Sequence, residues 1–167
     1  MSVVSKLEEN IPSLRRYAWT LLRQSSDADD LVQDCLVRAL GRIDTLRAEG
    51  DLRPWLFAIM HNLYVSRWRR LKRRPEVAVS DVEAELAMPP SQPASAEMRD
   101  VLRGLARLPE DQRQVLLLVA VEGFQYGEVA NMLGVPIGTV MSRLSRARDR
   151  LRDFMEGRGR PHLRRVK

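Results

Sequence analysis

The sequence predicts an all-α protein made of two small helical domains joined by an acidic linker that contains prolines. Apolar residues recur at steps of three and four along most of the chain, which is the spacing of one helix face, and no segment shows a strand pattern. Four prolines and scattered acidic residues gather between residues 75 and 94, a composition typical of a linker. We therefore assign residues 1–74 and 95–156 to the two domains, 75–94 to the linker, and 157–167 to a basic tail that we expect to be disordered.

Three helices are predicted in the first domain. Pro12 marks the start of the first helix or a kink within it. Ser25 or Ser26 can cap the second helix, and the acidic residues of its first turn suit the positive end of the helix dipole. Pro54 opens a third helix that runs to about Arg74. The inward residues of the second helix are predicted to be Leu31, Val32, Cys35, Leu36, Ala39 and Leu40.

Four helices are predicted in the second domain, and the last two form a helix-turn-helix. A short helix over 126–133 ends where Gly134 provides a left-handed C-cap, and Pro136 suits the first turn of the next helix, which runs to about Phe154. At ~100° per residue this last helix has two distinct faces. One face is apolar and consists of Val140, Leu144, Ala147, Leu151 and Phe154, and the other carries Thr139, Ser142, Arg143, Arg146 and Arg150.

The polar face of this last helix has the chemistry of a DNA-reading surface. Arginine guanidinium groups match phosphate oxygens and the guanine edge, and the major groove is wide enough to admit a helix. The alternative is an ordinary helical hairpin with a solvated charged face, because sequences that mimic a helix-turn-helix are common.

Charge is distributed in blocks along the chain. Overall, 28 Lys and Arg residues against 22 Asp and Glu residues give a net charge of +6, which favours a polyanionic partner. Residues 64–74 hold six basic residues and no acid, residues 75–98 hold five acids and no base, and the tail from Gly157 holds five bases and no acid. Such blocks indicate separate surfaces with different partners.

Aromatic side chains cluster on the same helix as the first basic block. Four of the nine aromatic residues are Trp55, Phe57, Tyr64 and Trp68. Rings stack on the bases of single-stranded DNA while neighbouring cations hold the backbone. We expect Trp55 to be a core residue, whereas for Phe57 and Tyr64 the pattern leaves core packing and base stacking equally open.

Several classes of protein are disfavoured. Cys35 is the single cysteine, so no intrachain disulfide can form and a reducing cytoplasm is the natural setting, with a buried structural thiol. His61 and His162 do not make a metal-ligand cluster, and no glycine-rich phosphate loop is present, so we expect neither an enzyme nor a bound metal or cofactor. No apolar run approaches the ~20 residues that cross a bilayer, and we expect no export signal.

Three segments match a known family. They are residues 27–34 (DADDLVQD), residues 52–62 (LRPWLFAIMHN), and residues 108–113 (LPEDQR) followed by 134–148 (GVPIGTVMSRLSRAR). In this order, with an acidic linker before the third, they resemble the bacterial RNA polymerase sigma factors of the extracytoplasmic-function (ECF) type over essentially the whole chain. Within that family, residues 11–15 and 51–57 are most similar to the general-stress sigma factors of alphaproteobacteria.

The resemblance implies a role in promoter-specific transcription initiation without an active site. The first domain would be sigma region 2, which binds core RNA polymerase at its clamp and reads and melts the −10 element. The second would be region 4, which reads the −35 element and contacts the flap. The loop from Leu46 to Arg53 would hold a flipped −10 base, and the linker would thread the polymerase channel. The expected partners are core polymerase, promoter DNA and an anti-sigma factor, all in the cytoplasm.

The matching positions give three groups of candidate residues. For docking on core polymerase we expect Asp30, Leu31, Gln33, Asp34 and Arg38. For the −10 element we expect Arg53, Asn62, Tyr64 and Arg67. For the −35 element we expect Thr139, Ser142, Arg143 and Arg146. The acids of the docking group also have a simpler explanation, which is that they complement the helix dipole.

The chain departs from the family pattern at three positions. Met141 stands where many relatives have a cation, Ser145 where a larger residue is common, and Gln125 where Ser or Thr often caps a helix. We expect position 141 to make no phosphate or guanine contact.

An alternative function is that of a sigma-like decoy, which sequesters an anti-sigma factor without binding a promoter. The two intact basic faces argue against this function.

Overall fold

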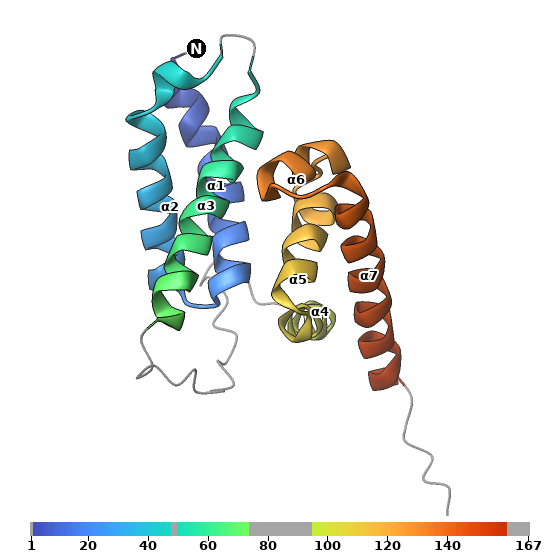
Figure 1. Cartoon of the computed structure of the whole chain (residues 1–167). Helices are drawn as coiled ribbons and strands as arrows, with labels where there is room; N and C mark the ends of the chain where they lie inside the picture. The colour runs from blue at the N-terminus through green and yellow to red at the C-terminus, as the bar shows by residue number, and fades with distance from the viewer. Residues whose placement is uncertain (1, 48–49, 74–94, 160–167) are drawn as a thin grey trace, which may run out of the picture.

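The computed structural model describes residues 2–47, 50–73 and 95–159, and these residues form two groups of helices. Helices α1 to α3 make up one group and α4 to α7 the other, and the two groups lie side by side (Figure 1). The all-α prediction is confirmed for the described residues, among which there is no strand. The predicted linker, 75–94, and the tail from residue 160 fall outside them.

The first domain is a bundle of three helices. It contains α1 (Val3–Leu22), α2 (Ser25–Leu40), a short 3-10 turn η1 (Ile43–Thr45) and α3 (Leu52–Lys72). Ser2 caps α1, because its Oγ accepts a hydrogen bond from the Ser5 N–H at 3.2 Å. The prediction placed Pro12 at the start of α1 or at a kink, and it lies inside the helix. The bundle closes on a core whose largest fully buried side chains are Tyr17, Phe57, Leu14, Leu31, Leu56 and Met60.

Helix α2 differs from the prediction at both ends. It begins at Ser25, so neither Ser25 nor Ser26 caps it; Gln24 is the N-cap residue and makes no side-chain capping bond. Leu40 was predicted to point inward, but it is 52% exposed. Ala39 takes the buried position in the last turn, and its neighbour on the helix therefore faces solvent.

Cys35 is buried on the inner face of α2, as the apolar stripe predicts. Its Sγ donates a hydrogen bond to the carbonyl oxygen of Leu56 in α3 at 3.4 Å. Burial raises the pKa of the Cys35 thiol to about 12. The reactive thiolate is therefore scarce near neutral pH, and the side chain serves as a structural group.

The second domain contains the predicted helix-turn-helix. Its elements are α4 (Ala96–Arg107), α5 (Glu110–Leu116), a π-helical segment η2 (Leu117–Val121), α6 (Tyr126–Leu133) and α7 (Ile137–Gly159). Gly134 has a φ of 65°, which confirms the left-handed C-cap of α6. Helix α7 continues to Gly159, beyond the predicted domain edge at residue 156. Its inward stripe is confirmed for Val140, Leu144 and Ala147, which are buried.

The start of α6 is capped in a way that the sequence analysis missed. Gln125 is the N-cap residue, and its backbone N–H donates a hydrogen bond to Oε2 of Glu128 at 2.8 Å. This is the carboxylate half of a capping box, so the absence of Ser or Thr at position 125 is compensated three residues later.

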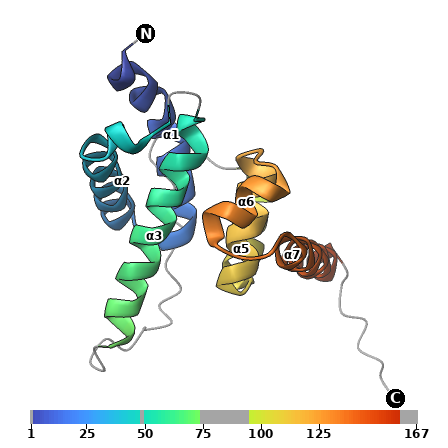
Figure 2. The same cartoon turned by 45° about the horizontal axis from the view of Figure 1, so that its top comes forward.

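The segment after α5 turns the chain towards the first domain. The Glu122 N–H donates to the carbonyl oxygen of Leu117, five residues earlier, at 3.0 Å, which is the π-helical pattern. Gly123 follows with a φ of 74°, a conformation that favours glycine. The next helix, α6, packs against α3, as the turned view shows (Figure 2). The π turn and Gly123 thus set which side chains of this corner face α1 and α3.

The buried stripe of α7 yields a prediction about stability. Leu144→Ala should lower the free energy of unfolding by about 2–5 kcal/mol, because Leu144 is 2% exposed and its removal leaves a cavity. Met141 lies one turn earlier on the same helix and is 52% exposed. Met141→Ala should therefore change the free energy of unfolding by no more than about 0.5 kcal/mol. Urea denaturation followed by circular dichroism measures both, and equal losses in the two variants would contradict this packing.

Candidate nucleic-acid interfaces

The predicted reading face of α7 is partly open and partly engaged within the chain. Ser142 and Arg146 are exposed, and the Ser142 Oγ donates to the carbonyl oxygen of Thr139 at 3.1 Å. Arg143 is different: its Nε lies 3.4 Å from Oδ2 of Asp111 in α5, and its side chain is 26% exposed. The α7 face therefore offers the exposed guanidinium groups of Arg146 and Arg150, beside that of Arg143, which contacts α5.

The basic end of α3 does not present the aromatic residue that the sequence analysis favoured. Tyr64 was expected among the −10 contacts, but it is 4% exposed and packs in the core of the first domain. Phe57, left open between two roles, is 1% exposed and is also core. Trp68 is the ring that reaches the surface here, with 42% exposure, because it lies one helical turn beyond Tyr64, where the bundle ends. Asn62 is exposed as expected.

Arg67 and Asp34, predicted for two different interfaces, contact each other. Arg67 Nη2 donates to Oδ2 of Asp34 at 2.5 Å, which links α3 to α2 across their surface. The side chains are 27% and 58% exposed, so the pair lies on the outside of the bundle. The predicted polymerase-docking and −10 surfaces are therefore adjacent.

The predicted docking face of α2 is exposed except at one position. Asp30, Gln33 and Arg38 lie on its outer side. Leu31 was placed in the same group, but it is fully buried and belongs to the core. Two apolar side chains on this helix were not singled out for docking: Val37 is 65% exposed and Leu40 is 52% exposed. The exposed side of α2 therefore combines acids, one cation and apolar surface, which is the composition of a protein-binding surface more than of a DNA-binding one.

Arg53, predicted to contact the −10 element, points at the second domain. Its Nη2 donates to Oε2 of Glu122 at 2.9 Å, and its Nη1 donates to the backbone carbonyl oxygen of Glu122, also at 2.9 Å. Arg16 of α1 holds the same carboxylate in a bidentate pair, with its Nε and Nη2 at 2.9 and 2.8 Å from Oε1 and Oε2. The Glu122 side chain is 1% exposed. Sequence reasoning missed Glu122 and Arg16.

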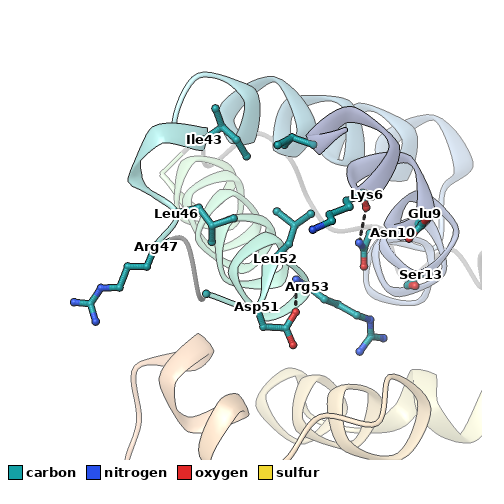
Figure 3. Close-up of a pocket in the computed structure, with 12 residues that line it drawn as sticks. Lys6, Glu9, Asn10, Ser13, Ile43, Leu46, Arg47, Asp51, Leu52 and Arg53 are labelled. Carbon is teal, nitrogen blue, oxygen red and sulfur yellow. Dashed lines mark hydrogen bonds between the residues drawn. The ribbon is translucent and has the colours of Figure 1, made fainter. Parts of the chain in front are cut away.

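A cavity of about 720 Å³ lies beside Arg53, between the first half of α1, η1 and the start of α3. In Figure 3, Lys6 and Asn10 of α1 face Leu52 of α3 across it, and Arg53 extends from its rim towards the second domain. Asn10 Nδ2 donates to the carbonyl oxygen of Lys6 at 2.8 Å. The mixture of ammonium, amide and apolar walls suits a flat polar group such as a nucleobase.

The described residues contain no group of three or more His, Cys, Asp and Glu side chains placed to hold a metal ion. Burial lowers the pKa of His61, which favours the neutral imidazole. Within the same residues no helix is long and apolar enough to span a bilayer.

Comparison with known proteins identifies the family. Residues 98–151 match the family described as region 4 of sigma-70, and residues 7–61 match the family described as the sigma2 domain of PhyR. Over 141 residues the chain is 40% identical to the ECF RNA polymerase sigma factor EcfG of Rhodopseudomonas palustris (strain TIE-1), with 84% of this chain and 78% of the relative covered. The chain belongs to the ECF family of RNA polymerase sigma factors.

More distant relatives and a solved structure support the same family. This sigma factor is 32% identical over 139 residues to the ECF sigma-E factor of Escherichia coli (strain K12), covering 75% of this chain and 72% of that one. Its fold is similar to that of the sigma factor RpoE from Bartonella quintana, solved in complex with the anti-sigma factor NepR. That match has a TM-score of 0.81 and 34% identity, and covers 91% of this chain and 95% of the other. The predicted sigma architecture of two helical domains is confirmed.

Trp68 gives the site its first testable prediction. Trp68→Ala should weaken binding of this sigma factor to single-stranded DNA of −10 sequence by about 1–3 kcal/mol, because a base can stack on the exposed indole. Tyr64→Phe should leave the affinity unchanged, because Tyr64 is buried. Fluorescence anisotropy with a labelled oligonucleotide measures both dissociation constants. If Tyr64→Phe weakens binding and Trp68→Ala does not, then Tyr64 contacts the DNA and is not buried in the DNA-bound protein.

Proposed function

We propose that this chain binds core RNA polymerase through α2 and directs it to promoters, reading the −10 element with the first domain and the −35 element with the second. The observation that carries the proposal is that each domain of this ECF sigma factor keeps exposed cationic groups on the helix that faces DNA in the predicted arrangement, Arg69 and Arg70 on α3 and Arg146 on α7. The chain acts as a cytoplasmic subunit of the transcription machinery, not as an enzyme, and it uses no cofactor.

For the −35 element, the geometry favours Ser142 and Arg146 as the base-contacting residues. Both lie within the first three turns of α7, the part of a recognition helix that enters the major groove. Arg143 contacts Asp111 through its Nε at 3.4 Å, and its terminal nitrogens are proposed to contact a phosphate at the groove edge. Thr139 lies near the helix start, where backbone phosphates approach.

For the −10 element, the cavity beside Arg53 is the proposed site of a flipped base. Its walls include Leu46, Asp51 and Leu52, which belong to the loop that the family resemblance implicates, and Lys6 from α1. Extruding a base costs a few kcal/mol, and holding it in a pocket helps to drive strand opening. Asn62 and Trp68 lie further along α3, about 15 and 24 Å from Leu52 by the helix rise, and would contact bases correspondingly further along the strand.

For polymerase, Asp30, Gln33 and Arg38 are the proposed polar contacts, and Val37 and Leu40 are the proposed apolar ones. A protein interface gains most of its affinity from desolvated apolar side chains, while surrounding charges steer association. Val37 and Leu40 would supply the apolar contacts of such an interface, and the surrounding charged residues of α2 would steer association. An anti-sigma factor is the other proposed partner, since RpoE of Bartonella quintana was solved with NepR bound.

A decoy that binds an anti-sigma factor remains the second candidate, because residues 7–61 match the sigma2 domain of PhyR. Run-off transcription with purified core polymerase distinguishes the two functions. The sigma factor should yield a promoter-dependent transcript, whereas a decoy should yield none while still binding an anti-sigma factor tightly.

Arg146 provides a test of −35 reading. Arg146→Ala should reduce affinity for a −35 duplex by about 1–3 kcal/mol, because a guanidinium that meets a guanine edge contributes that much. Met141→Ala is the matched control, since Met141 is exposed on the same helix and is expected to make no phosphate or guanine contact. An unchanged Arg146→Ala binding curve would remove Arg146 from the reading face.

Asp30 provides a test of polymerase docking. Asp34 pairs with Arg67 and Asp29 lies 3.2 Å from Arg15, so reversing either charge also alters the first domain. Asp30→Lys avoids both pairs and should weaken capture by core polymerase about tenfold or more, that is, by ~1.4 kcal/mol or more. Asp44→Lys reverses an exposed charge on η1 and should have little effect. If the Asp30→Lys protein still co-purifies with core polymerase at the wild-type level, the α2 assignment is wrong.

A further inference from the structure

We propose that Glu122 is an intramolecular competitor of promoter DNA: it holds Arg53, so that the free sigma factor is closed and Arg53 is withheld from the −10 strand until the two domains separate. The inference rests on the proposed role of Arg53 in −10 binding. It adds a conformational step that the chain must complete before it engages DNA.

The contact is built from charged hydrogen bonds that join the two domains. Glu122, at the corner after η2, accepts two hydrogen bonds from Arg16 and one from Arg53 on its carboxylate, and a fourth from Arg53 on its backbone carbonyl oxygen. Bonds of this type are stronger than neutral ones, and the side-chain carboxylate is almost fully shielded from water. They span α1, α3 and the second domain, so separating the domains breaks all four.

Two aromatic rings also contact the guanidinium of Arg53. Its guanidinium carbon lies 4.4 Å from the centre of the Phe124 ring and 5.3 Å from that of Phe57, within the range of cation–π attraction. The two rings meet edge to face with their centres 5.0 Å apart. Phe124 comes from the second domain and Phe57 from α3, so Arg53 is enclosed by both domains at once.

Part of the rest of the domain contact is poorly satisfied, which favours opening, although Arg23 Nη2 also donates across it to the carbonyl oxygen of Ala106 at 2.6 Å. Among the described residues, Tyr17 Oη, Gln112 Oε1 and Arg113 Nε are buried without a hydrogen-bond partner. Burial lowers the pKa of Arg113, a sign that the charged guanidinium loses hydration where α1 meets α5. Opening returns these atoms to water. The closed state is held by the charged hydrogen bonds of Glu122 together with the packing of α6 on α3 and the Arg23–Ala106 hydrogen bond.

The competition follows from the position of the guanidinium. Glu122 uses two of the five N–H donors of Arg53, one on each terminal nitrogen, and the rings of Phe57 and Phe124 lie against the group, so it stays turned into the domain contact. A phosphate oxygen and a carboxylate oxygen present the same chemistry to an arginine fork, so one replaces the other. The apparent affinity for the −10 strand is then the intrinsic affinity reduced by the fraction of open molecules.

The test uses Glu122→Gln in the full chain, which removes the charge and keeps the shape. Small-angle X-ray scattering should show a larger radius of gyration than for wild type, and anisotropy with a −10 oligonucleotide lacking a −35 element should show about tenfold tighter binding. Glu156→Gln, the same change at an exposed position of α7, should alter neither. Arg16→Gln, which breaks the bidentate pair without touching Arg53, should shift both readouts as Glu122→Gln does.

Each outcome decides something. If Glu122→Gln and Arg16→Gln both leave the radius of gyration at the wild-type value, Glu122 does not hold the closed state. If the domains separate and −10 affinity stays constant, Glu122 does not compete with DNA. Adding Arg53→Ala to Glu122→Gln should abolish the gain in affinity, and persistence of the gain would overturn the role of Arg53. Failure of the proposed function is distinct, because the wild-type chain would then direct no transcription with core polymerase.

Discussion

One buried carboxylate accepts charged hydrogen bonds that join the two halves of this protein. Glu122 has almost no contact with water, and an ionised carboxylate in that position is tolerated because positive partners and hydrogen bonds compensate its lost hydration. Those partners come from two helices of the first domain, Arg16 on α1 and Arg53 on α3. Glu122 therefore adds a charged constraint to the packing of α6 on α3, and the π turn that precedes Glu122 directs its side chain inward.

The surfaces assigned to different partners share structural elements. Helix α3 contributes Arg53 to the domain contact, Asn62 and Trp68 to the proposed −10 surface, and Arg67 to the ion pair with Asp34 of α2. A sigma factor this small assigns several contacts to one helix because its first domain contains only three long helices among the described residues.

The helices were predictable because they are local, whereas the contact between domains was not. Apolar periodicity placed α7 and its buried Val140 and Leu144, and Gly134 marked the end of α6. Leu31 was misassigned because the family motif over residues 27–34 is a continuous stretch, and a helix buries some members of any such stretch. Tyr64 lies outside the matching segments, and the cluster of aromatic and basic residues around it did not distinguish a buried ring from an exposed one. Glu122 carried no signal: its partners lie 106 and 69 positions away, and the π-helical shift before it breaks the spacing from which a face is inferred.

The environment of Cys35 has a practical consequence. It is the single cysteine of the chain, it is buried between α2 and α3, and its thiol ionises only at a pH far above neutral. Two cysteines introduced on the surface, one in each domain, would react with maleimide reagents while Cys35 stays unlabelled, without replacement of the native residue. Pairs of dyes or spin labels can thus be attached to otherwise unaltered protein, which makes distances between its two halves directly observable in solution.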